Sequence, residues 1–333
     1  MKLLVTGGLG FIGSNFIRYM LHEHGDCRII NVDDLRYGSS KNSLLNYENN
    51  DRYIFRKGDI ADSEFIADII KDVDAAVSFA AETHVDRSIA KPESFLQSNV
   101  QGVFSILESL RRYNSSARFV QISTDEVYGD IMDGSFTEDS TLRPSSPYSA
   151  SKAAGDVFVQ AYARTYGIQA MITRCTNNYG PYQFPEKLIP KTILRARNGL
   201  KIPIYGTGQN VRDWIYVIDH CRAVEKVLMK GSKGEIYNIS AGEEKTNLVV
   251  AGTILQMLGL SEDQIEFVED RPGHDVRYSL DSTKIREELG WHPLENFAEG
   301  IRKTANWYLQ NRDWWEPLMD DKVLSPAPWK LNW

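Results

Sequence analysis

The chain has 333 residues, of which 42% are hydrophobic and 25% are charged, a composition typical of globular enzymes with a sizeable core. Acidic residues outnumber basic ones by 45 to 38, and the resulting net charge of −7 argues against nucleic acid as a partner. No stretch approaches about eighteen apolar residues and the chain opens on a strand-like segment, so neither a membrane span nor a signal peptide is expected.

The first half of the chain alternates short apolar segments with amphipathic ones. Helical spacing of apolar residues predicts helices at residues 11–23, 63–71, 92–113 and 147–166. The apolar segments between them predict strands at residues 2–5, 28–32, 53–56, 75–79, 118–122 and 169–173. This alternation implies parallel strands joined by right-handed crossovers, and therefore an α/β fold with a doubly wound, mostly parallel Rossmann sheet.

The pattern changes after residue 173, where glycine and proline interrupt shorter elements. We expect a smaller mixed α/β domain here, with the chain returning to the main sheet around residues 212–230. The expected division gives the sheet domain residues 1–178 plus about 210–238, and the smaller domain about 179–209 plus 239–333.

A glycine-rich turn follows the first predicted strand and opens the first helix. Gly7 permits the tight turn, Gly10 lets the backbone approach a pyrophosphate, and Gly13 allows close packing of helix against sheet. The helix N-terminus then faces the phosphates of a dinucleotide. The spacing differs from the commoner dinucleotide pattern, but the strand–turn–helix setting favours a cofactor site over a turn that merely needs glycine. Ala80 and Ala81 end the fourth strand, where small side chains leave room for a cofactor.

Acidic residues stand at the ends of the second and third predicted strands. Asp33 follows Gly13 by about twenty residues, where a carboxylate binds the adenosine ribose and repels a 2′-phosphate, so NAD is favoured over NADP. Arg36 weakens that preference, and Asp34 fits a solvated loop equally well. Asp59 either reaches the adenine amino group or has a role in capping a helix or ordering the loop.

The most informative segment spans residues 123–129, Ser-Thr-Asp-Glu-Val-Tyr-Gly, and is followed by Tyr148 and Lys152. The tyrosine and lysine are four residues apart on a predicted helix and share one face. We expect the ammonium to lower the pKa of the phenol, so that a phenolate takes the proton of an alcohol while hydride leaves the same carbon.

Two adjacent carboxylates, Asp125 and Glu126, supply an acid and a base that alcohol oxidation alone does not need. Like charges push their pKa values apart and leave one of them protonated. The alternative is a solvated pair of loop acids, but this pair follows a strand at the carboxyl edge of the sheet, where sites form. We therefore expect oxidation, elimination and re-reduction on one substrate.

Together these motifs resemble the extended short-chain dehydrogenase/reductase family and, within it, the 4,6-dehydratases of dTDP-glucose. The resemblance covers essentially the whole chain, and Thr-Asp-Glu at residues 124–126 is its most specific mark. Its other marks are the glycine turn, the Tyr148/Lys152 pair, Ala-Ala-Glu-Thr-His-Val-Asp at 80–86, Asn-Asn-Tyr-Gly-Pro at 177–181, Arg-Asp-Trp at 212–214 and Arg-Pro-Gly-His-Asp at 271–275.

The resemblance implies net loss of water from the sugar, with NAD recycled. It implies that Tyr148 takes the proton of the 4-hydroxyl, that Lys152 lowers the tyrosine pKa and binds the nicotinamide ribose, and that Thr124 orients the 4-oxygen. Glu126 would then remove the C5 proton, which the 4-keto group acidifies. Asp125 would protonate the departing C6 hydroxyl before hydride returns to C6.

The resemblance also implies two sets of binding residues, and no metal site is expected. NAD contacts are expected from Gly7, Gly10, Phe11, Ile12, Gly13, Asp33, Asp34, Leu35, Arg36, Asp59, Ile60, Phe79, Ala80, Ala81, Ser98, Tyr148, Lys152 and Asn178. Nucleotide-sugar contacts are expected from His84, Thr124, Asn177, Lys187, Leu188, Pro203, Tyr205, Arg212, Asn247, Arg271, His274 and Tyr278. Arg212 and Arg271 are suited to grip a pyrophosphate, with a plain surface charge as the alternative for either.

Four other functions stay open at this point. An epimerase of the same family, or a related dehydratase on a UDP-sugar, would share Tyr148, Lys152 and NAD, but an epimerase has no use for the acidic pair. A decarboxylase would need an extra basic residue to hold a C6 carboxylate. An inactive NAD-binding sensor would not need the acid and base residues intact.

Family analogy predicts a homodimer in which the helices at residues 92–113 and 147–166 pair across a two-fold axis. The three cysteines, Cys27, Cys175 and Cys221, are an odd number without metal-like spacing. They predict reduced thiols and a cytoplasmic protein.

Overall fold

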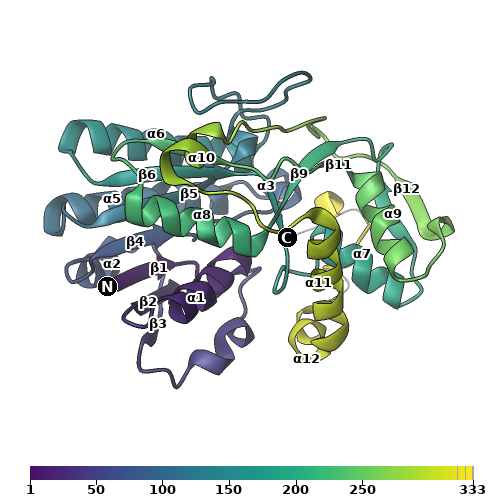
Figure 1. Ribbon diagram of the computed structural model, residues 1–333, viewed down its shortest axis with the longest axis horizontal. Coiled ribbons are helices and arrows are strands. Elements are labelled where there is room, and N and C mark those ends of the chain that lie inside the picture. Colours follow the sequence, from purple (N-terminus) through teal and green to yellow (C-terminus); the bar gives the residue numbers. More distant parts are fainter. Residues whose placement is uncertain (321, 327, 332–333) are drawn as a thin grey trace.

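The computed structural model describes residues 1–320, 322–326 and 328–331. Residues 321, 327, 332 and 333, which belong to the expected smaller domain, lie outside the described part. Figure 1 shows a larger part around a central sheet and a smaller part built mostly from the green and yellow C-terminal segments. No helix among the described residues is long and apolar enough to cross a membrane.

The central sheet has seven strands, all parallel, and the six predicted strands all belong to it. Their order is β10-β6-β5-β4-β1-β2-β3. The strands are β1 (Lys2–Thr6), β2 (Arg28–Asp33), β3 (Tyr53–Lys57), β4 (Ala75–Ser78), β5 (Arg118–Thr124), β6 (Ala170–Cys175) and β10 (Ile236–Ile239). The strand order reverses between β1 and β4, and such a switch point opens a crevice at the carboxyl edge of the sheet.

Helices cover both faces of this sheet, each through an apolar stripe. One face is covered by α1 (Phe11–Glu23), α8 (Val217–Lys230) and α10 (Thr283–Leu289). The other face is covered by α2 (Ser63–Ile70), α5 (Gly102–Tyr113) and α6 (Pro147–Tyr166).

Helix α6 begins and ends where its sequence signals lie. The Ser146 hydroxyl accepts the N–H of Ser149 at 3.1 Å, Pro147 takes the first helical position, and Gly167 ends the helix with a φ of 73°. These caps place Tyr148 in the first turn and Lys152 one turn later, both buried.

Among the described residues, the smaller part contains two short sheets, four α-helices and three short 3₁₀ segments. One sheet has the order β11-β9-β7 and the other pairs β12 with β8. Its elements are β7 (Asn177–Tyr179), α7 (Leu188–Arg197), β8 (Ile202–Tyr205), β9 (Val211–Tyr216), β11 (Glu244–Thr246), α9 (Asn247–Met257), η4 (Glu262–Gln264), β12 (Ile265–Val268), α11 (Phe297–Gln310), α12 (Arg312–Trp315), η5 (Glu316–Leu318) and η6 (Pro328–Lys330).

Two sequence predictions differ from the structure. The chain does not return to the central sheet at residues 212–216, because β9 pairs with β7 and β11, and the returning strand is β10 after α8. The helix predicted at residues 92–113 is instead α4 (Glu93–Leu96), a π-helical turn η2 (Gln97–Gln101) and α5. Such turns often mark functional sites, and this one carries Ser98. The sequence analysis also missed α3 (Val85–Ala90) and the 3₁₀ segment η1 (Lys41–Tyr47).

Candidate active site

Two cavities meet at the carboxyl edge of the central sheet. The larger, of about 300 Å³, follows the glycine-rich turn and the ends of the strands, and we refer to it as the cofactor cavity. The smaller, of about 190 Å³, extends between the two parts of the molecule, and we refer to it as the sugar cavity. Both cavities are lined by Thr83, His84, Glu126, Asn177, Glu186 and Lys187.

The glycine-rich turn forms a cradle that only glycine fits. A Cβ on Gly7, which has a φ of 70°, would lie 2.4 Å from the backbone nitrogen of Ala80. A Cβ on Gly13 would lie 2.4 Å from the Gly7 carbonyl oxygen. Gly10 begins α1 without any side-chain cap, so the first N–H groups of the helix suit the pyrophosphate of a dinucleotide.

Asp33 is buried at the end of β2 and is held by two backbone amides. Its Oδ2 accepts the N–H of Leu9 at 3.0 Å, and its Oδ1 accepts the N–H of Leu35 at 2.8 Å. Burial raises the pKa of Asp33, although these amides oppose the shift. Leu35 was expected to contact NAD, but it does not line the cavity and its side chain packs on the core. Its amide fixes the carboxylate instead.

Arg36 is held by acidic and hydroxyl groups at the rim of the cofactor cavity. Its guanidinium donates to Asp34 Oδ2 at 2.9 Å, to Ser98 Oγ at 2.7 Å and to Asp59 Oδ2 at 2.6 Å. Two carboxylates therefore offset the charge that weakened the sequence argument for NAD. Apart from Leu35, all the residues predicted to bind the cofactor line the cavity, which fits NAD.

Tyr148 and Lys152 both line the cofactor cavity, but the pKa of Tyr148 is shifted in the direction opposite to the one predicted. Burial raises the pKa of Tyr148 well above its usual value, and the charge of Glu126 raises it further. The Lys152 ammonium donates to the Ile122 carbonyl at 2.5 Å, and burial lowers its pKa. In this arrangement the tyrosine is a neutral phenol, because desolvation outweighs the hydrogen bond from Thr124 that favours the charged form.

The acidic pair follows β5 on a short 3₁₀ turn, η3 (Asp125–Val127). The Thr124 hydroxyl donates to Asp125 Oδ1 at 3.0 Å and accepts the N–H of Glu126 at 3.3 Å. Burial, followed by the charge of Glu126, raises the pKa of Asp125 to about 8. Asp125 is therefore protonated at neutral pH, and its Oδ2 is buried without a hydrogen-bond partner in the described part of the chain.

Glu126 has a different electrostatic environment from its neighbour. Burial raises its pKa too, but the charges of Arg271 and Arg212 oppose the shift. Arg212 also opposes the shift at Asp125, but there the second cause is the charge of Glu126, which raises the pKa further. These environments favour Asp125 as the protonated member of the pair, and the roles of acid and base stay a prediction.

The sugar cavity collects the predicted nucleotide-sugar residues from six segments of the chain. Thr124 lines the cofactor cavity, and the other predicted residues line the sugar cavity, namely His84, Asn177, Lys187, Leu188, Pro203, Tyr205, Arg212, Asn247, Arg271, His274 and Tyr278. Burial lowers the pKa of His84 well below its usual value and that of His274 to about 4. Both imidazoles are therefore neutral and suited to hydrogen bonding.

The two arginines differ in how their donors are used. Arg212 donates to the backbone carbonyls of Val211 at 2.7 Å, Asp275 at 2.8 Å and Val276 at 3.2 Å, and it stacks on a tyrosine ring. These N–H groups therefore hold the loop around residue 275 and are not free for bidentate binding of a pyrophosphate. Arg271 donates through Nη1 to a carboxylate, and its buried Nε has no partner within the described residues.

Sequence reasoning missed two buried carboxylates that organise this cavity. Asp86 accepts from Arg271 at 2.8 Å and from the Tyr205 hydroxyl at 3.3 Å. Glu186 accepts from the Tyr37 hydroxyl at 2.7 Å, and its other oxygen lies 3.6 Å from His84 Nε2. A signal was present for Asp86, which ends the Ala-Ala-Glu-Thr-His-Val-Asp motif, but its arginine partner lies 185 residues away.

The described residues form neither a candidate metal cluster nor a disulfide. Among the described residues, no group of three or more His, Cys, Asp or Glu side chains could hold a metal ion. Cys27, Cys175 and Cys221 are free and buried.

Known proteins are similar to this chain in sequence and in fold. The family model described as GDP-mannose 4,6 dehydratase matches residues 4–304. A dTDP-glucose 4,6-dehydratase of Streptomyces niveus is 47% identical over 332 residues, covering 98% of each chain. The low-salt glycan biosynthesis protein Agl12 of Haloferax volcanii is 50% identical over 309 residues, covering 93% of this chain and 99% of that protein.

A solved structure agrees in fold over nearly the whole length. The crystal structure of DesIV, a dTDP-glucose 4,6-dehydratase of Streptomyces venezuelae with NAD bound, matches with a TM-score of 0.93 and 48% identity, covering 96% of this chain and 100% of that one. Full-length identity of this size, together with the acidic pair beside the tyrosine, assigns the family. The chain belongs to the family that the GDP-mannose 4,6 dehydratase model describes and, within it, to the dTDP-glucose 4,6-dehydratases.

Proposed function

We propose that this protein converts dTDP-glucose to dTDP-4-keto-6-deoxyglucose, with NAD as a recycled cofactor. The reaction comprises oxidation at C4, loss of water across C5 and C6, and reduction at C6. The observation that carries the proposal is the placement of Asp125 and Glu126, on η3 at the end of β5, in the cavity that also contains Tyr148. Full-length similarity to proteins named dTDP-glucose 4,6-dehydratase supports the substrate.

The first step uses the groups on α6 and at the end of β5. NAD, when bound, accepts hydride from C4 and returns it to C6. Tyr148 is assigned to take the proton of the 4-hydroxyl as a phenolate, a state that burial opposes and that Lys152, one helical turn away, and the positive charge of bound NAD would favour. Thr124, whose hydrogen bond already favours that charged form, holds the 4-oxygen in place.

The elimination uses the acidic pair. The 4-keto group makes the C5 proton acidic, and Glu126 removes it as a general base. Asp125 donates its proton to the C6 oxygen, which leaves as water. The unpartnered Oδ2 of Asp125 is the oxygen suited to this donation, because no other group in the described structure competes for its proton.

Binding of the nucleotide part is assigned to the sugar cavity. Arg271 provides a buried cation for the diphosphate, with Asp86 fixing its direction. Tyr205 and His274 lie near each other, with ring centroids 6.2 Å apart, and suit a base or sugar face. By this proposal residues 1–178 plus about 210–238 hold NAD and the remaining segments hold the nucleotide sugar, although β9 pairs with the smaller part.

A homodimer is the expected assembly, and the exposed face of α4, α5 and α6 is its proposed interface. Leu96, Val157, Phe158 and Tyr166 are large apolar side chains exposed on these helices, and such patches mark interfaces. Sedimentation should give a dimer that Phe158→Glu converts to monomer, while Leu294→Glu, at an exposed leucine elsewhere, should leave it intact. We also propose a cytoplasmic location, consistent with three free thiols.

A substrate panel tests the function. The protein is incubated with dTDP-, UDP-, GDP- and CDP-glucose, and product masses are read by mass spectrometry. We expect loss of one water from dTDP-glucose, with no stoichiometric NADH. An epimerised sugar of unchanged mass, or preference for another nucleotide, would replace this proposal with one of the alternatives.

The acidic pair is tested separately in single-turnover experiments. Glu126→Gln should stop solvent deuterium from entering C5, and Asp125→Asn should let the 4-keto-glucose nucleotide accumulate. Each loss should be ~100-fold or more on the elimination steps, the range for a positioned acid or base. Release of dehydrated product by both variants at the wild-type rate would show that the carboxylates are wrongly assigned.

A further inference from the structure

Behind the acidic pair lies a buried polar network that the mechanism above does not use. Tyr128 comes directly after η3 and is 1% exposed. Its hydroxyl accepts from Arg174 Nη1 at 2.7 Å and donates to Asn238 Oδ1 at 3.0 Å. The guanidinium also lies over its ring, 4.7 Å from the centroid. The residue that follows the acid–base turn is thus tied to two neighbouring strands, β6 and β10.

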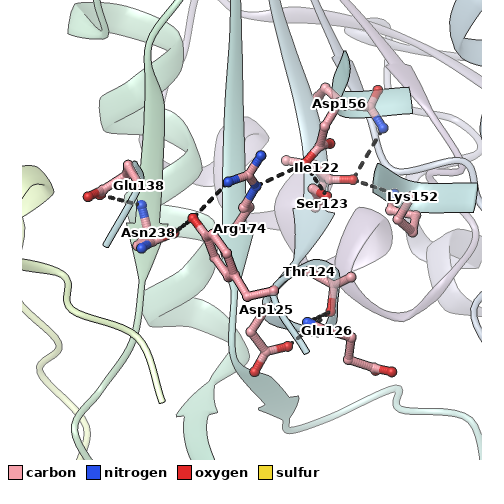
Figure 2. A network of polar contacts seen from close by, with 12 residues as sticks. Ile122, Ser123, Thr124, Asp125, Glu126, Glu138, Lys152, Asp156, Arg174 and Asn238 are labelled. Atoms are coloured by element: carbon pink, nitrogen blue, oxygen red, sulfur yellow. Dashed lines mark hydrogen bonds and ion pairs between the residues drawn. The ribbon is translucent and has the colours of Figure 1, made fainter. Parts of the chain in front are cut away.

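The same arginine reaches the other half of the catalytic machinery. Arg174 Nε donates to Asp156 Oδ2 at 2.9 Å, and the Ser123 hydroxyl donates to the same oxygen at 3.0 Å. Asp156 lies on α6, one turn after Lys152, and Ser123 precedes Thr124 on β5. Figure 2 shows Arg174 between Asp156 and Asn238, with Asp125 and Glu126 at the adjoining end of β5.

A loop closes the far end of the network. The N–H of Asn238 donates to Glu138 at 2.8 Å, and its side-chain amide donates to the Phe136 carbonyl at 3.1 Å. The Phe136 ring stacks on Tyr128, with centroids 5.0 Å apart. The links through Tyr128 and Asp156 are buried and those to Glu138 and Phe136 are partly buried, so displacement of one member requires its neighbours to lose hydrogen bonds in a low-dielectric interior.

We propose that Tyr128, Arg174 and Asp156 act as positioning residues that fix the acid–base turn relative to Tyr148 and Lys152. The proposal rests on the dehydratase function above. One rigid network holds both groups, so the sugar that is oxidised at C4 already has C5 and C6 in line with Glu126 and Asp125. Because small displacements of catalytic groups cost large factors in rate, loosening the turn end should harm elimination more than oxidation.

Tyr128→Phe is the first test, since it removes one hydroxyl and keeps the stacked ring. We expect elimination, read as deuterium entering C5 and release of dehydrated product, to slow by ~10-fold or more. C4 oxidation, read as NADH absorbance in a single turnover, should stay within ~2-fold of wild type. Tyr237→Phe is the matched control, because that buried β10 tyrosine also loses hydroxyl bonds, to Glu288 and the Ser232 amide, away from both cavities.

Asn238→Ala gives an independent variant that leaves Tyr128 and Arg174 intact. It should reproduce the selective loss of elimination, in smaller measure. Equal slowing of oxidation and elimination in both variants, or a Tyr237→Phe effect of the same kind, would reduce the network to a general stabilising role and overturn the proposal. If wild-type protein does not dehydrate dTDP-glucose, the proposed function itself fails, which is a separate outcome.

Discussion

The cofactor cavity and the sugar cavity are built by different means. The cofactor cavity is shaped by backbone at the edge of a parallel sheet, where Gly7 and Gly13 leave no space for a Cβ. The sugar cavity is shaped by long side chains from elements far apart in the chain, such as Asp86 on α3 and Arg271 in a loop. The turn that faces the pyrophosphate is therefore encoded in a short stretch of sequence, whereas recognition of the nucleotide sugar depends on tertiary assembly.

The two cavities also differ in their charged groups. At the cofactor cavity, Asp34 and Asp59 surround Arg36 and leave an acidic rim that suits the ribose of NAD. At the sugar cavity, Arg271 is paired with Asp86, and Arg212 holds backbone carbonyls. The catalytic groups lie where the two cavities meet, and variants at each location should separate the two contributions.

The largest effect is expected where both cavities meet. Tyr148→Phe removes the base for C4 oxidation and should lower turnover by ~100-fold or more. NAD content and the affinity for dTDP-glucose should change little, because the ring stays in place. Absorbance at the nicotinamide band and binding calorimetry measure these three quantities on one preparation. A variant with near-normal turnover would remove the residue from the mechanism.

The second-largest effect is expected from a substitution that disturbs only the cofactor cavity. Gly13→Ala places a Cβ 2.4 Å from the Gly7 carbonyl oxygen. Overpacking of this kind costs about 1–3 kcal/mol, equivalent to ~5-fold to ~150-fold weaker NAD binding if the strain is relieved without cofactor. The sugar cavity should keep its affinity for dTDP. Unchanged NAD content after purification would contradict the cradle.

A substitution that disturbs only the sugar cavity should raise the KM for dTDP-glucose. Arg271→Gln removes the buried cation while keeping a hydrogen-bonding side chain, and Asp86 loses its ion-pair partner. A hydrogen bond to a charged group contributes about 1.5–3 kcal/mol, so KM for dTDP-glucose should rise at least ~10-fold while NAD content stays normal. Arg277→Gln, at a half-buried arginine paired with Glu244, provides the control.

Near neutral pH, the smallest change is expected from pH itself. Asp125 must be protonated to act as an acid, and burial and Glu126 raise its pKa to about 8. Its protonated form is complete well below pH 8 and declines above it, so C6–O cleavage should fall ~10-fold per unit at higher pH. Single-turnover cleavage in a pH series measures this limb, and Asp125→Asn should abolish it. A wild-type cleavage rate that is flat from pH 7 to about 10 would contradict Asp125 as the acid.

The sequence alone determined six of the seven strands of the central sheet and the cofactor turn. The spacing of apolar residues, together with the turn residues between them, predicted six strands. The capping residues Ser146 and Gly167 set the ends of α6 at residues 147–166. Glycine spacing and the Thr-Asp-Glu triplet act over a few residues, so their geometry follows from local backbone and can be inferred without the fold.

Only the tertiary structure decided which charged residues distant in sequence come into contact and how burial shifts the pKa values of ionisable groups. The pairing of Asp86 with Arg271 joins residues that no local pattern connects. Burial keeps Tyr148 protonated where the sequence argued for a phenolate, because desolvation depends on the neighbours that the fold supplies. The strand at residues 211–216 joined the smaller sheet for the same reason: its partners, β7 and β11, are chosen by packing rather than by its own residues.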